Sequence, residues 1–197
     1  WYVVKDPFMV LRSYKGQQYD NSPYYQGEGY IGWEKLKQLS HKQPYDAFLL
    51  GNSCTMAFDC SEWNKYIHAR PYRFFINNEN LGDLCVKLHA LDSLYRRPVR
   101  YLLIITEPSS FSSCVLRDGP MHIMPTDVSG ASESKIQLTF FQSFLDTRFL
   151  LPYLRYQITG KYDRGMQNRI SPYCPTRTLW TNDAILHQED TIKAQGK

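Results

Sequence analysis

The chain lacks a long hydrophobic run, a cysteine framework and any concentration of positive charge. No stretch reaches the roughly 20 apolar residues of a membrane-spanning helix, and the first residues lack the pattern of a signal peptide. The basic residues behind the net charge of +4 are scattered, so nucleic acid is not an expected partner. The five cysteines are odd in number and irregularly spaced, which disfavours a disulfide framework or a CxxC metal site and leaves at most one bridge open. We expect no metal and no other cofactor.

The length of 197 residues fits one domain with a full-sized core, or one domain with an additional arm. Residues 1–43 read as an extended N-terminal arm with a short helix over 33–41, because Tyr, Gly, Gln and Asn dominate its first part. The apolar start, Trp1 to Val4, is either an N-terminal strand or the remainder of a membrane anchor. Residues 44–197 form the predicted second unit, an α/β domain.

Apolar runs that suit buried strands alternate with stretches of helical spacing in the predicted domain. Strands are expected at 47–50, 72–76 and 99–105. Helices are expected at 55–68, broken near Asp59, and at 81–94; after an irregular stretch over 112–132, further helices are expected at 133–158 and 183–194. Such alternation predicts the α/β class, with a mainly parallel sheet between two helical layers in a three-layer, flavodoxin-like α/β/α sandwich.

Ligands of parallel sheets bind beyond the carboxyl ends of the strands, which here are followed by the loops 51–55, 77–82 and 106–113. In the first loop, Gly51 permits a sharp turn and Asn52 precedes Ser53 at the start of a helix. A serine in this position presents its hydroxyl to the cleft, and its backbone N–H can stabilise an oxyanion. Ser and Thr are also ordinary helix caps, so the pattern alone does not establish catalysis.

The second and third loops supply candidate partners for Ser53. Asn78, Asn80 and Gly82 offer the neutral amide and backbone donors of an oxyanion hole, although Asn also makes turns and caps helices. Glu107 follows the third strand and either orients a partner or binds a polar substrate group, unless it is simply a solvated acid.

A nucleophilic serine needs a base, and none of the five histidines is marked out clearly. His187 lies four residues after Asp183, which places both on one face of the predicted last helix, and this pair is the candidate base and its orienting acid. His122, in the long irregular stretch, also has a route to the cleft.

The block from Phe48 to Thr55, followed by Phe58-Asp59, resembles the first block of the SGNH (GDSL-type) hydrolases, especially a divergent, membrane-anchored bacterial branch. The resemblance covers residues 44–108. It implies that Ser53 is the nucleophile of an esterase or acyltransferase acting on an acyl ester, such as an O-acetyl group, of a glycan, an envelope component or a small acyl substrate. It also implies an extracytoplasmic or periplasmic domain whose membrane anchor precedes residue 1.

The sequence departs from that family in three places. Asn52 stands where the family has Asp, and neither a Gly-x-Asn-Asp block nor an Asp-x-x-His block is found. Either the catalytic histidine lies beyond Lys197, or the triad is incomplete and the domain is a non-catalytic binding or assembly module. A nucleotide-binding domain is a third alternative, disfavoured because the first loop has neither a GxGxxG nor a Walker pattern.

Overall fold

Three parallel strands form the centre of the fold, in the order β2-β1-β3. The computed structural model describes residues 1–15 and 28–160. Strand β1 lies between its two neighbours, with Leu50 in register with Phe74 on one side and Ile104 on the other. The chain is thus a mixed α/β protein, and all three strands predicted from the sequence are confirmed: β1 (Ala47–Gly51), β2 (Pro71–Phe75) and β3 (Tyr101–Ile105).

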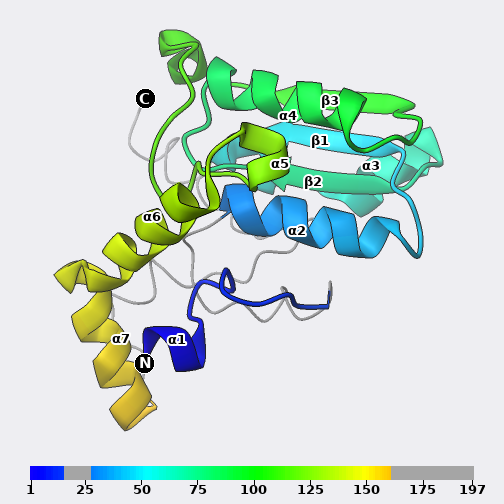
Figure 1. Cartoon of the computed structure of the whole chain (residues 1–197). Coiled ribbons are helices and arrows are strands. Elements are labelled where there is room, and N and C mark those ends of the chain that lie inside the picture. The colour runs from blue at the N-terminus through cyan, green and yellow to red at the C-terminus, as the bar shows by residue number, and fades with distance from the viewer. Residues whose placement is uncertain (16–27, 161–197) are drawn as a thin grey trace, which may run out of the picture.

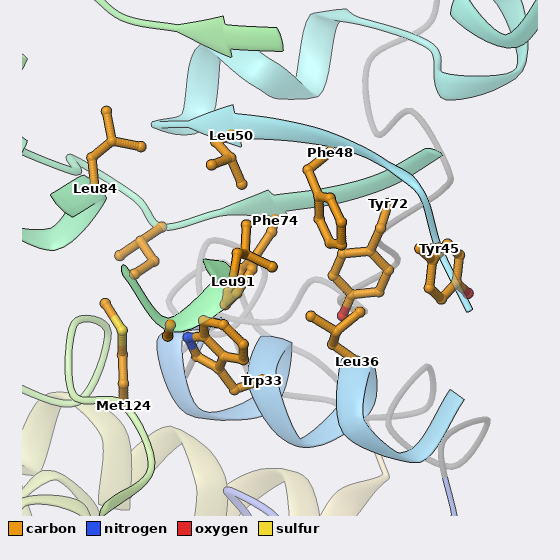
Figure 2. Packing of buried hydrophobic residues seen from close by; sticks show 12 residues of the cluster. Trp33, Leu36, Tyr45, Phe48, Leu50, Tyr72, Phe74, Leu84, Leu91 and Met124 are labelled. Atoms are coloured by element: carbon orange, nitrogen blue, oxygen red, sulfur yellow. The ribbon is translucent and has the colours of Figure 1, made fainter. Parts of the chain in front are cut away.

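Two helices cover one face of this sheet and form the main hydrophobic core with it (Figure 1). They are α2 (Glu28–Ser40) and α4 (Leu81–Ser93). Figure 2 shows Trp33 and Leu36 of α2 pointing toward the aromatic side chains of the strands. The ring of Trp33 meets that of Phe74 edge to face, with 4.9 Å between centroids. Helix α2 begins at Glu28, five residues before the predicted start, and its apolar side is part of the sheet core. The division at residue 43 stays a prediction.

The opposite face of β2 is covered by the segment that follows β1. This segment consists of the 3₁₀ helix η2 (Ser53–Ala57) and helix α3 (Cys60–Ile67), and Asp59 caps α3 at the break expected from the sequence. Arg73 points toward this segment because strand side chains alternate and its neighbours Tyr72 and Phe74 face the main core. Its buried guanidinium donates to the carbonyl oxygens of Met56 and Phe58, each at 3.3 Å.

Strand β3 is the less protected edge of the sheet. In the described part of the chain it pairs only with β1, and Leu102 and Ile104 are 45% and 38% exposed. Its side chains alternate between partly buried and exposed, whereas every residue of β1 is buried.

A second hydrophobic cluster lies beside the sheet and joins the start of the chain to its last described helices (Figure 1). Phe8 is fully buried there, with its ring 4.8 Å from that of Phe149. Residues 2–5 are helical, so the expectation of an N-terminal strand is wrong. The cluster includes residues of α1 (Tyr2–Lys5), α6 (Glu133–Leu145) and α7 (Thr147–Thr159). The helical stretch expected at 133–158 is divided at Asp146, whose side chain caps α7. Among the described residues, no helix is both long and apolar enough to cross a membrane.

Candidate functional site at the carboxyl edge of the sheet

The turn after β1 is shaped by Gly51 and Asn52. Gly51 has a φ of 134°, and a Cβ at this position would lie 1.9 Å from the carbonyl oxygen of Ile105 in β3. Only glycine fits both the backbone conformation and the close strand contact. Asn52 is fully buried and caps η2, because its side-chain oxygen accepts from the N–H of Cys54 at 2.9 Å. Its backbone oxygen accepts from the hydroxyl of Thr55, also at 2.9 Å.

Ser53 is therefore held at the carboxyl end of the central strand, as the first residue of η2. Its side chain is partly exposed, and its hydroxyl makes no hydrogen bond to any other described residue. The hydroxyl is therefore available to a ligand, since Asn52 and not Ser53 caps η2. Arg73 supports this turn from beneath through its bonds to the carbonyls at the end of η2. This role is not among those predicted from the sequence, although a lone arginine in an otherwise apolar strand is a signal for a buried polar contact.

Glu107 brings the loop after β3 to the same place. Its carboxylate accepts from the thiol of Cys54 at 3.9 Å and from the hydroxyl of Ser109 at 2.8 Å. The pKa of the Cys54 thiol is raised, first by desolvation and then by the nearby Glu107 charge. A raised pKa keeps the thiol protonated, so the exposed Cys54 is not the activated nucleophile of this edge.

The Asn-rich turn after β2 reaches the same edge, but much of it is bound within the protein. Asn80 caps α4 by accepting from the N–H of Asp83 at 3.0 Å, and its amide nitrogen donates to the carbonyl of Val115 at 2.9 Å. Gly82 packs so tightly against residues 114–116 that a Cβ would lie 2.6 Å from the carbonyl oxygen of Cys114. Asn78 is different: it is exposed, and its side-chain amide is not bonded to another described residue.

A buried polar cluster fixes this turn to α4. Lys87 lies 2.6 Å from the Glu79 carboxylate and donates to the carbonyl of Phe74 at 2.7 Å. Burial raises the pKa of Glu79 to about 7 although Lys87 opposes the shift, and burial lowers the pKa of Lys87. Nδ1 of His122 lies 2.9 Å from the carboxylate of Asp83, which ties the loop before α5 (Thr126–Ser129) to α4. His122, considered above for its route to the cleft, is thus buried and paired with Asp83, a contact that residue spacing does not reveal.

Glu28 extends the buried cluster to the first turn of α2. One carboxylate oxygen accepts from the side-chain amide of Asn77 at 3.1 Å, and the other is buried with no hydrogen-bond partner among the described residues. Desolvation raises the pKa of Glu28 from 4.5 to about 8. The side chain is therefore uncharged in the folded protein at neutral pH and ionised in the unfolded chain.

We expect Glu28→Gln to change how stability depends on pH. The protonated Glu28 carboxyl suits its buried position. Its contribution to the free energy of unfolding is complete below about pH 4.5 and is lost as the pH rises toward about 8. The glutamine of the variant cannot ionise, so its free energy of unfolding should improve relative to wild type by about 3 kcal/mol between about pH 5 and pH 8. Urea unfolding at both pH values measures this, with Glu34→Gln in the same helix as the control. Parallel pH profiles for wild type and Glu28→Gln would contradict the assignment.

The structure brings together the three predicted loops, since parallel pairing places the ends of all three strands at one edge. Ser53, Glu107 and Asn78 are at least partly exposed there, whereas Asn52, Asn80 and Gly82 are buried. His187 and Asp183 lie outside the described residues. Within the described ranges, no group of three His, Cys, Asp or Glu side chains could hold a metal ion.

Comparison with known proteins identifies no relative: no family model, curated protein or solved structure matches the chain.

Proposed function

We propose that the carboxyl edge of the sheet is the active site of a serine esterase or acyltransferase of the SGNH type, with Ser53 as the nucleophile. The observation that carries the proposal is the position of Ser53: it directly follows the turn at the end of the central strand, with a partly exposed and unbonded hydroxyl. The strand order β2-β1-β3 is also the one that a flavodoxin-like sheet would have around its first strand. The substrate would be an acyl ester, such as an O-acetyl group, of a glycan, an envelope component or a small molecule.

The reaction begins with attack of the Ser53 hydroxyl oxygen on the ester carbonyl carbon, while a base accepts the hydroxyl proton. The resulting oxyanion is stabilised by the backbone N–H of Ser53 and the exposed amide of Asn78. Collapse of the intermediate expels the alcohol, which takes the proton back, and leaves an acyl group on Ser53. Water then releases the acyl group as an acid, or an acceptor hydroxyl takes it.

The roles of the other residues at this edge follow from whether each one is exposed or packed within the protein. Asn80 and Gly82 support the edge from within, because both are packed against the loop at 114–116. Glu107 stands beside Cys54 and is placed to orient a polar part of the substrate. His187, with Asp183, is the proposed base on the strength of the sequence alone.

The proposed location is extracytoplasmic, with an anchor preceding residue 1. This part of the proposal rests on the family resemblance of the sequence. Exposed free thiols at Cys54, Cys85 and Cys114 weigh against it, because exposed thiols are more typical of reducing compartments.

Hydrolysis of p-nitrophenyl acetate and of acetylated xylo-oligosaccharides tests the proposed chemistry. Ser53→Ala should lower the initial rate at least about 10³-fold, to the level of the uncatalysed reaction, because the other hydroxyl of this turn, that of Thr55, is buried and bonded to Asn52. Ser112→Ala, an exposed serine in the neighbouring loop, should leave the rate within about twofold of wild type. His187→Gln should reduce the rate about as strongly as Ser53→Ala. Equal rates for wild type and Ser53→Ala would remove the proposal.

A non-catalytic glycan-binding module is the second candidate function. It is favoured because several candidate catalytic groups already contact other parts of the protein. Asn80 and Gly82 pack against the loop at 114–116, and Nδ1 of His122 is bonded to Asp83. In that case the wild-type protein should bind the acetylated oligosaccharides without hydrolysing them, and Ser53→Ala should bind with unchanged affinity.

A further inference from the structure

A cleft of about 470 Å³ lies at the end of the fold opposite to Ser53. It is bounded by the second half of α2, by the turn that follows α4, and by α5, and these helices lie on the same face of the sheet (Figure 1). The segments at 40–41 and 94–97 precede β1 and β3 respectively, so the cleft is at the amino ends of the strands. Its volume is that of an ordinary small-molecule site.

The charge of this cleft is positive. Arg96 and Arg97 line it from the turn after α4, and both are exposed without a hydrogen bond or ion pair to another described residue. The acidic side chain in the lining, Asp127, is already paired with Lys37 at 2.7 Å. Lys37 also contacts Glu34, which is not part of the lining, at 3.0 Å. Within the lining, the cations Lys37, Arg96 and Arg97 therefore outnumber the carboxylate of Asp127.

The backbone conformation of Arg96 shapes the turn that follows α4. Its φ of 52° lies in the left-handed region, which costs a residue other than glycine about 1–2 kcal/mol. Left-handed residues commonly end helices, as His68 does after α3. This turn places both Arg96 and Arg97 in the lining of the cleft.

The inner wall of the cleft is apolar and aromatic. Leu94, which is 41% exposed, and the partly exposed Tyr95 line it beside the arginines. Leu36 and Trp33 of α2 border it from the main core and are buried (Figure 2). The indole nitrogen of Trp33 is buried and donates to no described residue. One part of the lining is thus basic and the other is apolar. A small ligand with an anionic group at one end and a less polar remainder would match both parts.

We propose that this cleft binds a small ligand that carries a phosphate or carboxylate group on a body of about monosaccharide size. The planar guanidinium groups of Arg96 and Arg97 bind the oxyanion in the two-pronged geometry that both groups allow. The body of the ligand contacts Leu94 and Tyr95, next to the buried indole of Trp33. The inference does not depend on the reaction proposed for Ser53, because the two sites lie at opposite ends of the sheet.

Titration of the ¹⁵N-labelled protein with glucose 6-phosphate, glucuronate and glucose tests the proposal by nuclear magnetic resonance. At least one of the two anions should shift the Trp33 indole signal and the amide signals of residues 94–97, and glucose should not. A response to glucose 6-phosphate alone identifies the phosphate, and a response to glucuronate alone identifies the carboxylate. The proposal is overturned if neither anion shifts these signals, or if glucose binds as tightly as the anions.

Substitutions then show whether the arginines are responsible. Arg96→Gly with Arg97→Gln should weaken anion binding at least tenfold, and glycine suits the backbone conformation at position 96. The charge-matched control, Lys65→Gln with Arg148→Gln, removes two exposed cations elsewhere and should alter the affinity less than twofold. Arg97→Gln alone serves as a second variant that leaves the strained position intact, and it should weaken binding at least threefold. Anion binding that is unchanged in both variants would also overturn the proposal.

Discussion

Gly51→Ala should be among the most damaging single substitutions in the chain. A methyl group at this position would lie 1.9 Å from the carbonyl oxygen and 2.9 Å from the carbonyl carbon of Ile105. Both are backbone atoms of a neighbouring strand, so relief requires β1 and β3 to separate next to Ser53. The left-handed φ of 134° adds strain of its own. We expect a loss of more than about 4 kcal/mol, comparable with the whole stability of many domains.

Gly119→Ala is the matched control for the conformational part of this loss. Gly119 also has a left-handed φ, of 109°, but a Cβ there would meet no atom within 4 Å. Its substitution should cost about 1–2 kcal/mol. Urea unfolding followed by circular dichroism gives both values. If Gly51→Ala is no more destabilising than Gly119→Ala, the close contact between β1 and β3 is not as described.

Lys87→Met should cost about 3–5 kcal/mol at pH 7, because it leaves the Glu79 carboxyl buried without its cation. It also removes the bond from the ammonium group to the carbonyl of Phe74, which joins α4 to the end of β2. The Asn-rich turn would then lose the interaction that holds it beside the site.

The pH dependence and a double variant separate the charge from the packing in this effect. The raised pKa of Glu79 means that its contribution to stability is complete below about pH 4.5 and is lost as pH rises through about 7. Lys87→Met should therefore be less destabilising at pH 5 than at pH 8, and adding Glu79→Gln should recover much of the loss at pH 8. Lys65→Met breaks an exposed ion pair of the same 2.6 Å length and should leave the free energy of unfolding almost unchanged. A similar cost for Lys87→Met and Lys65→Met would rule out a buried pair.

The order of strands and helices could be predicted from the sequence because the signals are local. Short apolar runs such as 47–50 and the helical spacing over 81–94 are readable from a few neighbouring residues. Asp59 and Asp146 mark the starts of α3 and α7 because a cap needs only its own helix.

The interior of the site could not be predicted, because it depends on contacts between distant segments. Asn80 and Gly82 have the residue types of oxyanion donors, but the loop at 114–116 packs against both of them. Lys87 and Glu79 pair across the start of α4, and His122 meets Asp83 across 39 residues of chain. Arg73 supports the η2 turn from a strand of a different βα unit. Residue types and spacing indicate the carboxyl edge of the sheet as the candidate site. Long-range packing determines which of its polar groups are exposed to a ligand.

Covalent labelling of the folded wild-type protein with a fluorophosphonate, followed by peptide mapping with mass spectrometry, tests the nucleophile most directly. We expect one adduct, on the hydroxyl of Ser53, and no adduct after heat denaturation. An adduct on another residue, or a folded protein that stays unmodified under conditions that label a known serine esterase, would contradict this expectation.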